Sequence, residues 1–342
     1  MRTAPFFEDL SLGHVERAAP AVTLTDGMAA AHRSIVGDRL ALALDMTLAR
    51  DVLGSSSLLA HPALVWDVAI GQSTLLTGRV IANLFYRGLV LQRAPVIGDT
   101  LATSTEVVAL RQTTQRPQRP ANGLAVLRIS TRDQDGRPVL DFFRCAMLPL
   151  RDDAAQTGRE DSFDRIPAEL DATALRSATS SWRLDAFAAA RVQTRRVGES
   201  DDDTPATLKP GTRWAVEGGD VVSSAPELAR LTLNVAAVHH DRHAHPEGRR
   251  LVYGGHTIGL AAAQATRSLP QIATIVGWHS CEHLAPVHEG DTLYSELELE
   301  RSEPLDDIGA LAHLRSRVTA IGEQGDGSAK AVLDWRFVAL VA

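Results

Sequence analysis

The chain has 342 residues, of which 44% are hydrophobic and 23% charged, a composition that excludes wholesale disorder. This length suits two domains of roughly 150 to 170 residues better than a single one. With a net charge of -7 and a pI of about 5.9, the protein is a poor match for a nucleic-acid backbone, although a local arginine cluster could hold a small phosphorylated ligand.

Two features bear on the compartment. The only cysteines, Cys145 and Cys281, are far apart and form neither a disulfide framework nor a zinc site by themselves. The first ten residues lack the apolar run of a signal peptide, and no apolar segment reaches membrane-spanning length. We therefore expect a cytoplasmic protein with no membrane partner.

The first part of the chain is predicted to form helices and then strands. Thr25 is expected to cap a helix that runs to Val36, and a second helix is predicted from about Pro62 to Leu76. Alternating or β-branched runs then predict strands at 79–85, 100–110, 125–131 and 139–150.

A polar stretch separates this part from the rest. Residues 151–181 contain few bulky apolar side chains and read as a solvated linker, although 170–191 could carry helix. We assign residues 1–150 to an N-terminal domain, 151–180 to the linker and 181–342 to a C-terminal domain. The acidic run at 199–203 is expected to be a solvated loop rather than a metal site.

The second part repeats the order of the first. Ser224 is expected to cap a helix to Leu231, and a thin helix rich in glycine and alanine is predicted from Gly255 to Arg267. Strands are predicted at 272–279, 292–300, 312–319 and 332–342. Small side chains on the second helix would let a sheet wrap closely around it.

Short motifs recur at nearly one offset. Gly-Asp-Thr-Leu at 98–101 returns at 290–293, and Val-Leu-Asp before an aromatic residue occurs at 139–142 and at 332–335. Several matches in the same order indicate an internal duplication. Helices followed by a run of antiparallel strands in each half give the α+β class.

These motifs, with Phe-Phe-Glu-Asp at 6–9 and His-x-Asp-Arg at 239–242, resemble the MaoC-like dehydratases, which are (R)-specific enoyl-CoA hydratases, and in particular their mesaconyl-CoA (β-methylmalyl-CoA) hydratase branch. The resemblance implies two hot-dog domains, each a long helix wrapped by an antiparallel sheet, fused as a pseudo-dimer in one chain. It implies reversible hydration of a 2-enoyl-CoA bound at the junction, with no cofactor besides that substrate, by a homodimer.

The family pattern is then carried over to the second half. It has an Asp, a His five residues later, and the Gly of a His-Gly pair as an oxyanion-hole amide. His239 takes the acid/base role, Gly255 the amide role, and Asn234 stands where the family has Asp. An amide side chain can hold a water but cannot take its proton. Three further residues are candidates for support, namely Asp38, Asp241 and His256.

The first half has lost this pattern. Asp38 matches the position of Asn234, but Ala43 stands where the second half has His239. The His-Gly pair is replaced by His61-Pro62, and proline has no backbone N–H to donate. We therefore expect this half to be catalytically degenerate and to shape the acyl pocket.

Other residues give weaker indications. Gly254, Trp278, Arg87 and Arg242 are candidates for substrate binding, with packing or a solvated surface as the alternative for each side chain. His279, His283 and His288 are expected at the surface. The histidines at 239, 240, 243 and 245 suggest a metal site, but Pro246 and Gly248 follow at once, and we expect no metal.

Two alternatives to a hydratase stay open. Hot-dog proteins also include thioesterases, and fold alone does not fix function. A non-catalytic acyl-CoA-binding subunit is the other alternative, and Asn234 in place of Asp is its main support.

Overall fold

The computed structural model describes residues 4–115, 120–193, 209–244, 248–305, 309–323 and 327–342. The helices are α1 (Asp26–Val36), α2 (Met46–Leu53), α3 (Pro62–Gln72), α4 (Ala172–Thr179), α5 (Leu184–Gln193), α6 (Ala225–Leu231) and α7 (Gly254–Ser268). The long strands are β3 (Ala82–Leu91), β4 (Thr100–Gln112), β5 (Asn122–Arg132), β6 (Pro138–Pro149), β9 (Ile272–His283), β10 (Thr292–Pro304), β11 (Ala310–Ile321) and β12 (Ala329–Val341). The short strands are β1 (Val15–Glu16), β2 (Val22–Thr23), β7 (Arg213–Ala215) and β8 (Asp220–Val221).

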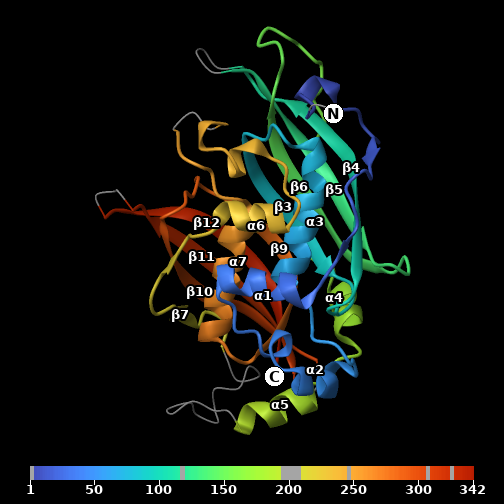
Figure 1. Ribbon diagram of the computed structural model, residues 1–342, viewed down its shortest axis with the longest axis vertical. Coiled ribbons are helices and arrows are strands. Elements are labelled where there is room, and N and C mark those ends of the chain that lie inside the picture. Colours follow the sequence, from blue (N-terminus) through green and yellow to red (C-terminus); the bar gives the residue numbers. More distant parts are fainter. Residues whose placement is uncertain (1–3, 116–119, 194–208, 245–247, 306–308, 324–326) are drawn as a thin grey trace.

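One antiparallel sheet runs through both halves of the chain (Figure 1). The strand order β4-β5-β6-β3 in the first half is matched by β10-β11-β12-β9 in the second. The two halves join where β3 pairs with β9, with Tyr86 opposite Cys281 and Leu89 opposite Trp278. Because the same order occurs on each side of this seam, the sheet supports the predicted duplication and the α+β class.

Two central helices lie against this sheet and against each other (Figure 1). Every residue of α3 is buried, so its sequence shows no polar face. Trp66 of α3 packs edge-on against Trp278 and Trp335 from the second half, with ring centroids 4.7 and 6.2 Å apart. On α7, Gly259 lies where a Cβ would come within 2.9 Å of Val36 on α1, so the small residue admits a neighbouring helix.

The two helices also fix how the halves correspond. Helix α3 starts at Pro62 after the N-cap His61, and α7 starts at Gly254 after the N-cap Tyr253. The bridges just before them, Leu59 to Val96 and Leu251 to His288, stand at the same offset. Pro62 therefore corresponds to Gly254, and its predicted match with Gly255 was wrong by one residue.

Local structure agrees with the prediction at some positions and differs at others. Thr25 caps α1 as expected, accepting from the Met28 amide at 3.2 Å. Ser224 stands at the N-cap of α6 but makes no side-chain cap bond; the Ala225 amide donates instead to Glu289 at 3.1 Å. Strand β3 starts later than predicted and continues to Leu91, because β6 and β9 pair with it on both sides. Helix α2 was not predicted.

The region between the halves is partly helical. Helix α4 packs on β3 and β9, and α5 packs on α2. The acidic run at 199–203 lies outside the described residues. Over the described ranges, no helix is long and apolar enough to span a membrane.

Candidate active site

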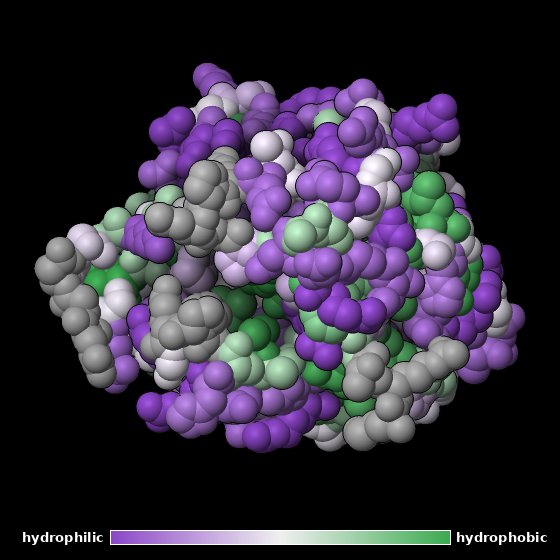
Figure 2. All heavy atoms as spheres, turned by 90° about the horizontal axis from the view of Figure 1, so that it is seen from above, coloured by the Kyte–Doolittle hydropathy of each residue, from purple (hydrophilic) through white to green (hydrophobic). Residues whose placement is uncertain are grey.

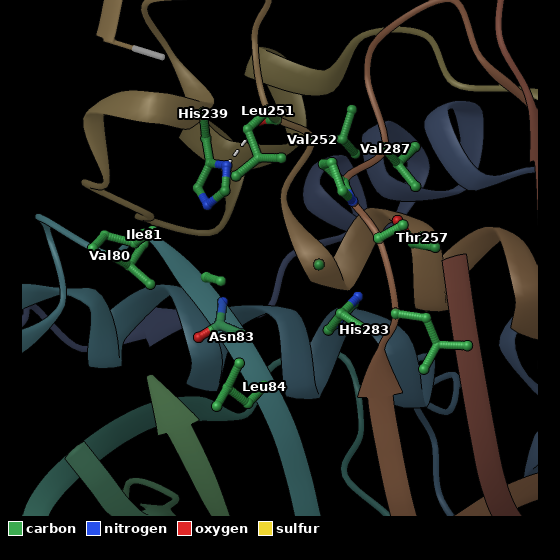
Figure 3. A pocket seen from close by; sticks show the side chains of 15 residues that line it. Val80, Ile81, Asn83, Leu84, His239, Leu251, Val252, Thr257, His283 and Val287 are labelled. Atoms are coloured by element: carbon green, nitrogen blue, oxygen red, sulfur yellow. Dashed lines mark hydrogen bonds between the residues drawn. The ribbon is translucent and has the colours of Figure 1, made fainter. Parts of the chain in front are cut away.

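A cavity of about 330 Å³ opens at the junction of the two halves (Figure 3). Strand β3 forms one wall, and the loop carrying His239, the start of α7 and the end of β9 form the others. Most of the lining is aliphatic, and its hydrophilic side chains come from Asn83, His239, Thr257 and His283. The residues that the structure places around the cavity include no carboxylate. Such a cavity favours an apolar ligand held by a few polar contacts.

His239 presents an unprotonated nitrogen to this cavity. It ends a 3-10 helix (Ala237–His239), and its Nδ1 lies 2.9 Å from the Leu251 carbonyl oxygen. Because a carbonyl can only accept, Nδ1 carries the hydrogen and Nε2 keeps its lone pair. Burial lowers the pKa of His239 to about 4; the charges of Arg144 and His240 add to this effect, and the Leu251 bond opposes it. His239 is therefore a neutral base at pH 7.

Gly254 places a backbone amide at the cavity wall. It is the first residue of α7, where N–H groups have no partner within the helix and the helix dipole favours negative charge. A Cβ at this position would lie 2.7 Å from Nε2 of His283. A Cβ on Gly255 would instead meet Oδ1 of Asp67 at 2.0 Å. Gly254 lines the cavity and Gly255 does not, so Gly254 replaces Gly255 as the candidate for the amide role.

Asn234 shapes the loop that carries His239. Its Oδ1 accepts from the Ala236 amide at 2.9 Å, and its backbone oxygen lies 2.6 Å from Nε2 of His240. Asn234 is buried, and it is not among the residues lining the cavity. The structure thus gives it a local structural role and does not place it at the expected water site.

Two of the residues expected to support His239 do not reach it. Asp241 is exposed, and its Oδ1 accepts from the His243 amide at 2.9 Å, which stabilises the following turn. His256 is fully buried away from the cavity lining, and burial lowers its pKa to about 3. The partner of His239 is a backbone carbonyl rather than a carboxylate.

Asp38, the third such residue, belongs to a separate recess in the first half. Its Oδ2 lies 2.8 Å from Nε2 of His61, and its Oδ1 accepts from Leu40 at 2.7 Å. Burial raises the pKa of Asp38, but the charge and hydrogen bond of His61 outweigh it, so the pKa lies below its usual value. The carboxylate of Asp38 is therefore ionised and already engaged by these partners. It offers His239 no help.

The remaining sequence candidates also lie elsewhere. Trp278 is fully buried and packs against Trp66 and Trp335. Arg87 lies 3.9 Å from Glu282, and Arg242 is exposed. None of these three lines the cavity.

The sequence indicated neither Asn83 nor Thr257, and it wrongly placed three histidines at the surface. His279 and His288 are buried, and His283 points into the cavity from the end of β9 (Figure 3). Burial, with the charges of Arg144 and His239, lowers the pKa of His283 to about 4. The sequence did carry a signal for His283, because it is a polar residue at the end of the mostly apolar strand β9.

Two residues of the histidine-rich run make contacts with backbone oxygens. His239 and His240 each direct a ring nitrogen to a backbone oxygen. His245 lies outside the described residues, and within the described part of the chain no group of three potential metal ligands occurs.

Comparisons with known proteins agree with this architecture. No family model matches the chain. The β-methylmalyl-CoA dehydratase of Chloroflexus aurantiacus is 30% identical over 319 residues, which cover 90% of this chain and 86% of that protein. The mesaconyl-CoA hydratase of Cereibacter sphaeroides is 29% identical over 322 residues, which cover 90% and 87%.

Solved structures show the same fold. A conserved hypothetical protein of Mycobacterium tuberculosis with a double hot-dog fold has a TM-score of 0.87 and 50% identity, covering 98% of each chain. A putative MaoC-domain dehydratase from Chloroflexus aurantiacus has a TM-score of 0.83 at 24% identity, covering 99% of this chain and 97% of that one. The chain belongs to the MaoC-like dehydratases with a double hot-dog fold, the family that includes β-methylmalyl-CoA dehydratase.

Proposed function

We propose that the protein adds water to a 2-enoyl-CoA thioester, and in reverse dehydrates a 3-hydroxyacyl-CoA. The observation that carries this proposal is the neutral imidazole of His239 in an apolar cavity whose wall also includes the first amide of α7, at Gly254. The names of the two curated relatives add the substrate class, a short dicarboxylic or branched acyl group such as mesaconyl.

The mechanism follows from these two groups. Nε2 of His239 takes a proton from water as the water oxygen bonds to C3. The C2–C3 π electrons move toward the thioester carbonyl and form an enolate, whose oxygen accepts from the Gly254 amide. The imidazolium then returns the proton to C2, so that one water has been added and His239 is neutral again. An oxyanion donor of this kind is worth roughly 3–4 kcal/mol in other enzymes.

The mouth of the cavity suits the thioester arm. Ile81 from the first half and Leu284 from the second are 45% and 53% exposed, and both line the cavity. They offer the pantetheine arm an apolar entrance made by both halves. Figure 2 shows apolar side chains gathered in a hollow on an otherwise largely hydrophilic face. The degenerate half thus contributes β3 as a wall rather than a second set of catalytic groups.

The test is direct. The purified protein is incubated with mesaconyl-CoA and crotonyl-CoA, and loss of conjugated absorbance is followed together with the mass gain of one water. Release of free thiol without hydration would instead support a thioesterase. Tight binding without turnover of either thioester would support a non-catalytic subunit. We also propose a homodimer, for which light scattering should give twice the 36.8 kDa of the chain.

A further inference from the structure

Behind the cavity wall lies a buried positive charge. Arg144 of β6 is 1% exposed, its Nε donates to Oδ1 of Asn83 at 2.7 Å, and its Nη1 donates to Oγ of Ser73 at 2.9 Å. Among the described residues it forms no ion pair with a carboxylate. Burying a guanidinium without a counter-charge is costly, so its retention needs a reason.

The fold itself does not require this arginine. In the first half Arg144 lies opposite Tyr86, and in the second half Phe337 lies opposite Trp278 at the corresponding place. Phe337 is fully buried and stacks on Trp335, with ring centroids 4.0 Å apart. The second half therefore packs an aromatic ring where the first half keeps a cation.

Asn83 connects this cation to the cavity. An arginine can only donate, so the bond to Arg144 fixes Oδ1 of Asn83 toward the guanidinium. The amide nitrogen then turns the other way, into the cavity on the side of His239, as Figure 3 shows. Asn83 therefore presents N–H donors, and Arg144 polarises them from behind.

Two polar atoms nearby are also unused. The Tyr86 hydroxyl and Nε2 of His283 are buried without a hydrogen-bond partner among the described residues, and the two rings lie 5.8 Å apart. The positive charge of Arg144 acts on groups that line the cavity, and it helps to lower the pKa values of both His239 and His283. Without any carboxylate in the lining, this end of the cavity favours an anionic group.

We propose that Asn83, oriented and polarised by Arg144, binds a carboxylate on C3 of the acyl group, so that the site selects dicarboxylic 2-enoyl thioesters. Asn83 contacts the carboxylate, and Arg144 acts through Asn83 as the positioning and charge-supplying residue. The inference rests on the proposed function for the reaction, but its binding component can be tested without turnover.

Binding of saturated analogues tests it first. Dissociation constants of succinyl-CoA and butyryl-CoA, which differ at the acyl end by a carboxylate, are measured by calorimetry for the native protein and for Arg144→Met. Loss of a unit charge about 6 Å from the bound carboxylate, in a partly buried site, should weaken succinyl-CoA binding on the order of 100-fold. Butyryl-CoA binding should change less than threefold.

Three variants serve as controls. Arg144→Lys keeps the charge and should restore part of the preference for succinyl-CoA. Arg128→Met removes an exposed arginine of β5 that pairs with Asp141 at 3.1 Å, and should change neither constant. If Arg144→Met does not fold, Asn83→Asp gives the same test by placing a negative charge at the cavity wall, and should selectively abolish succinyl-CoA binding.

Equal weakening of both ligands would overturn the proposal, because it would mean that Arg144 serves the thioester end or the packing. No weakening of succinyl-CoA binding would overturn it as well. Turnover provides a second comparison, between mesaconyl-CoA and 2-methylcrotonyl-CoA, which carries methyl in place of the carboxylate. A selective loss of binding in a protein that hydrates neither thioester would support the carboxylate site and refute the hydratase.

Discussion

Replacing His239 by asparagine separates its catalytic role from its structural one. The side-chain nitrogen of asparagine can occupy the place of Nδ1 and keep the bond to the Leu251 carbonyl, now 2.9 Å long. The basic Nε2 is lost. A positioned general base contributes about 10²–10⁴-fold in rate, so kcat/KM should fall by that factor, or about 3–5 kcal/mol of transition-state stabilisation.

The pH dependence gives this prediction a second measurement. With a pKa of about 4 for His239, about 90% of the imidazole is neutral at pH 5, whereas an unperturbed histidine would be only about 3% neutral. The native enzyme should therefore keep most of its kcat/KM at pH 5, and the residual activity of His239→Asn should lose this acid limb.

The assay follows mesaconyl-CoA absorbance from pH 3.5 to 8, with thermal unfolding as the control for folding. His239→Ala, which also loses the Leu251 bond, should unfold at a lower temperature than His239→Asn. A folded His239→Asn variant that retains more than about a third of native activity would refute the catalytic assignment. A native acid limb centred near pH 6.5 would refute the buried neutral imidazole.

The other predictions concern single positions. Gly254→Ala should fold and lose at least tenfold in kcat/KM, because the added methyl meets an imidazole nitrogen of His283 at 2.7 Å. Gly255→Ala should mainly lower the melting temperature, because its methyl meets a buried carboxylate oxygen of Asp67. The opposite pattern would restore Gly255 as the amide donor. His256 has a pKa near 3 in the folded state, so the unfolded chain binds more protons between pH 6.5 and 3, and stability falls as pH falls through that window. The free energy of unfolding, measured with denaturant, should fall between pH 7 and 4.5 by about 3 kcal/mol less in His256→Leu than in the native protein. Equal decreases in the two proteins would disprove this. Asn234→Asp should fold, since Asp38 makes the same backbone contact in the first half. It should keep its activity, because the side chain does not line the cavity; loss of turnover in a folded variant would contradict the local structural role.

Part of the site was predictable because the chain contains a second copy of the motif in which the candidate catalytic residues are replaced. His239 could be singled out since the first copy carries Ala43 at the matching position, and the structure places its ring in the cavity. The structure places Gly254 rather than Gly255 at the cavity wall, and counting along the sequence cannot decide which of two adjacent glycines starts the helix. That choice follows from the N-cap Tyr253, after which the helix starts at Gly254, one residue earlier than predicted.

The partners expected for His239 were wrong for a related reason. Spacing places Asp241 two residues away, but its carboxylate is exposed and accepts from the backbone amide of His243. The ring is held instead by the backbone oxygen of Leu251, twelve residues along the chain. A backbone carbonyl has no side-chain signature, so no reading of residue types could have identified it.

The amino-acid sequence by itself determined the duplication, the α+β class, the family and the histidine, because each of these is carried by residues close together in the chain or repeated at a fixed offset. Only the tertiary structure decided the rest of the cavity. Asn83, Arg144 and His283 come from β3, β6 and β9, and they meet because β3 pairs with β6 on one side and with β9 on the other. The register of that pairing is a property of the assembled sheet, since a shift of one residue would turn each of these side chains to the opposite face.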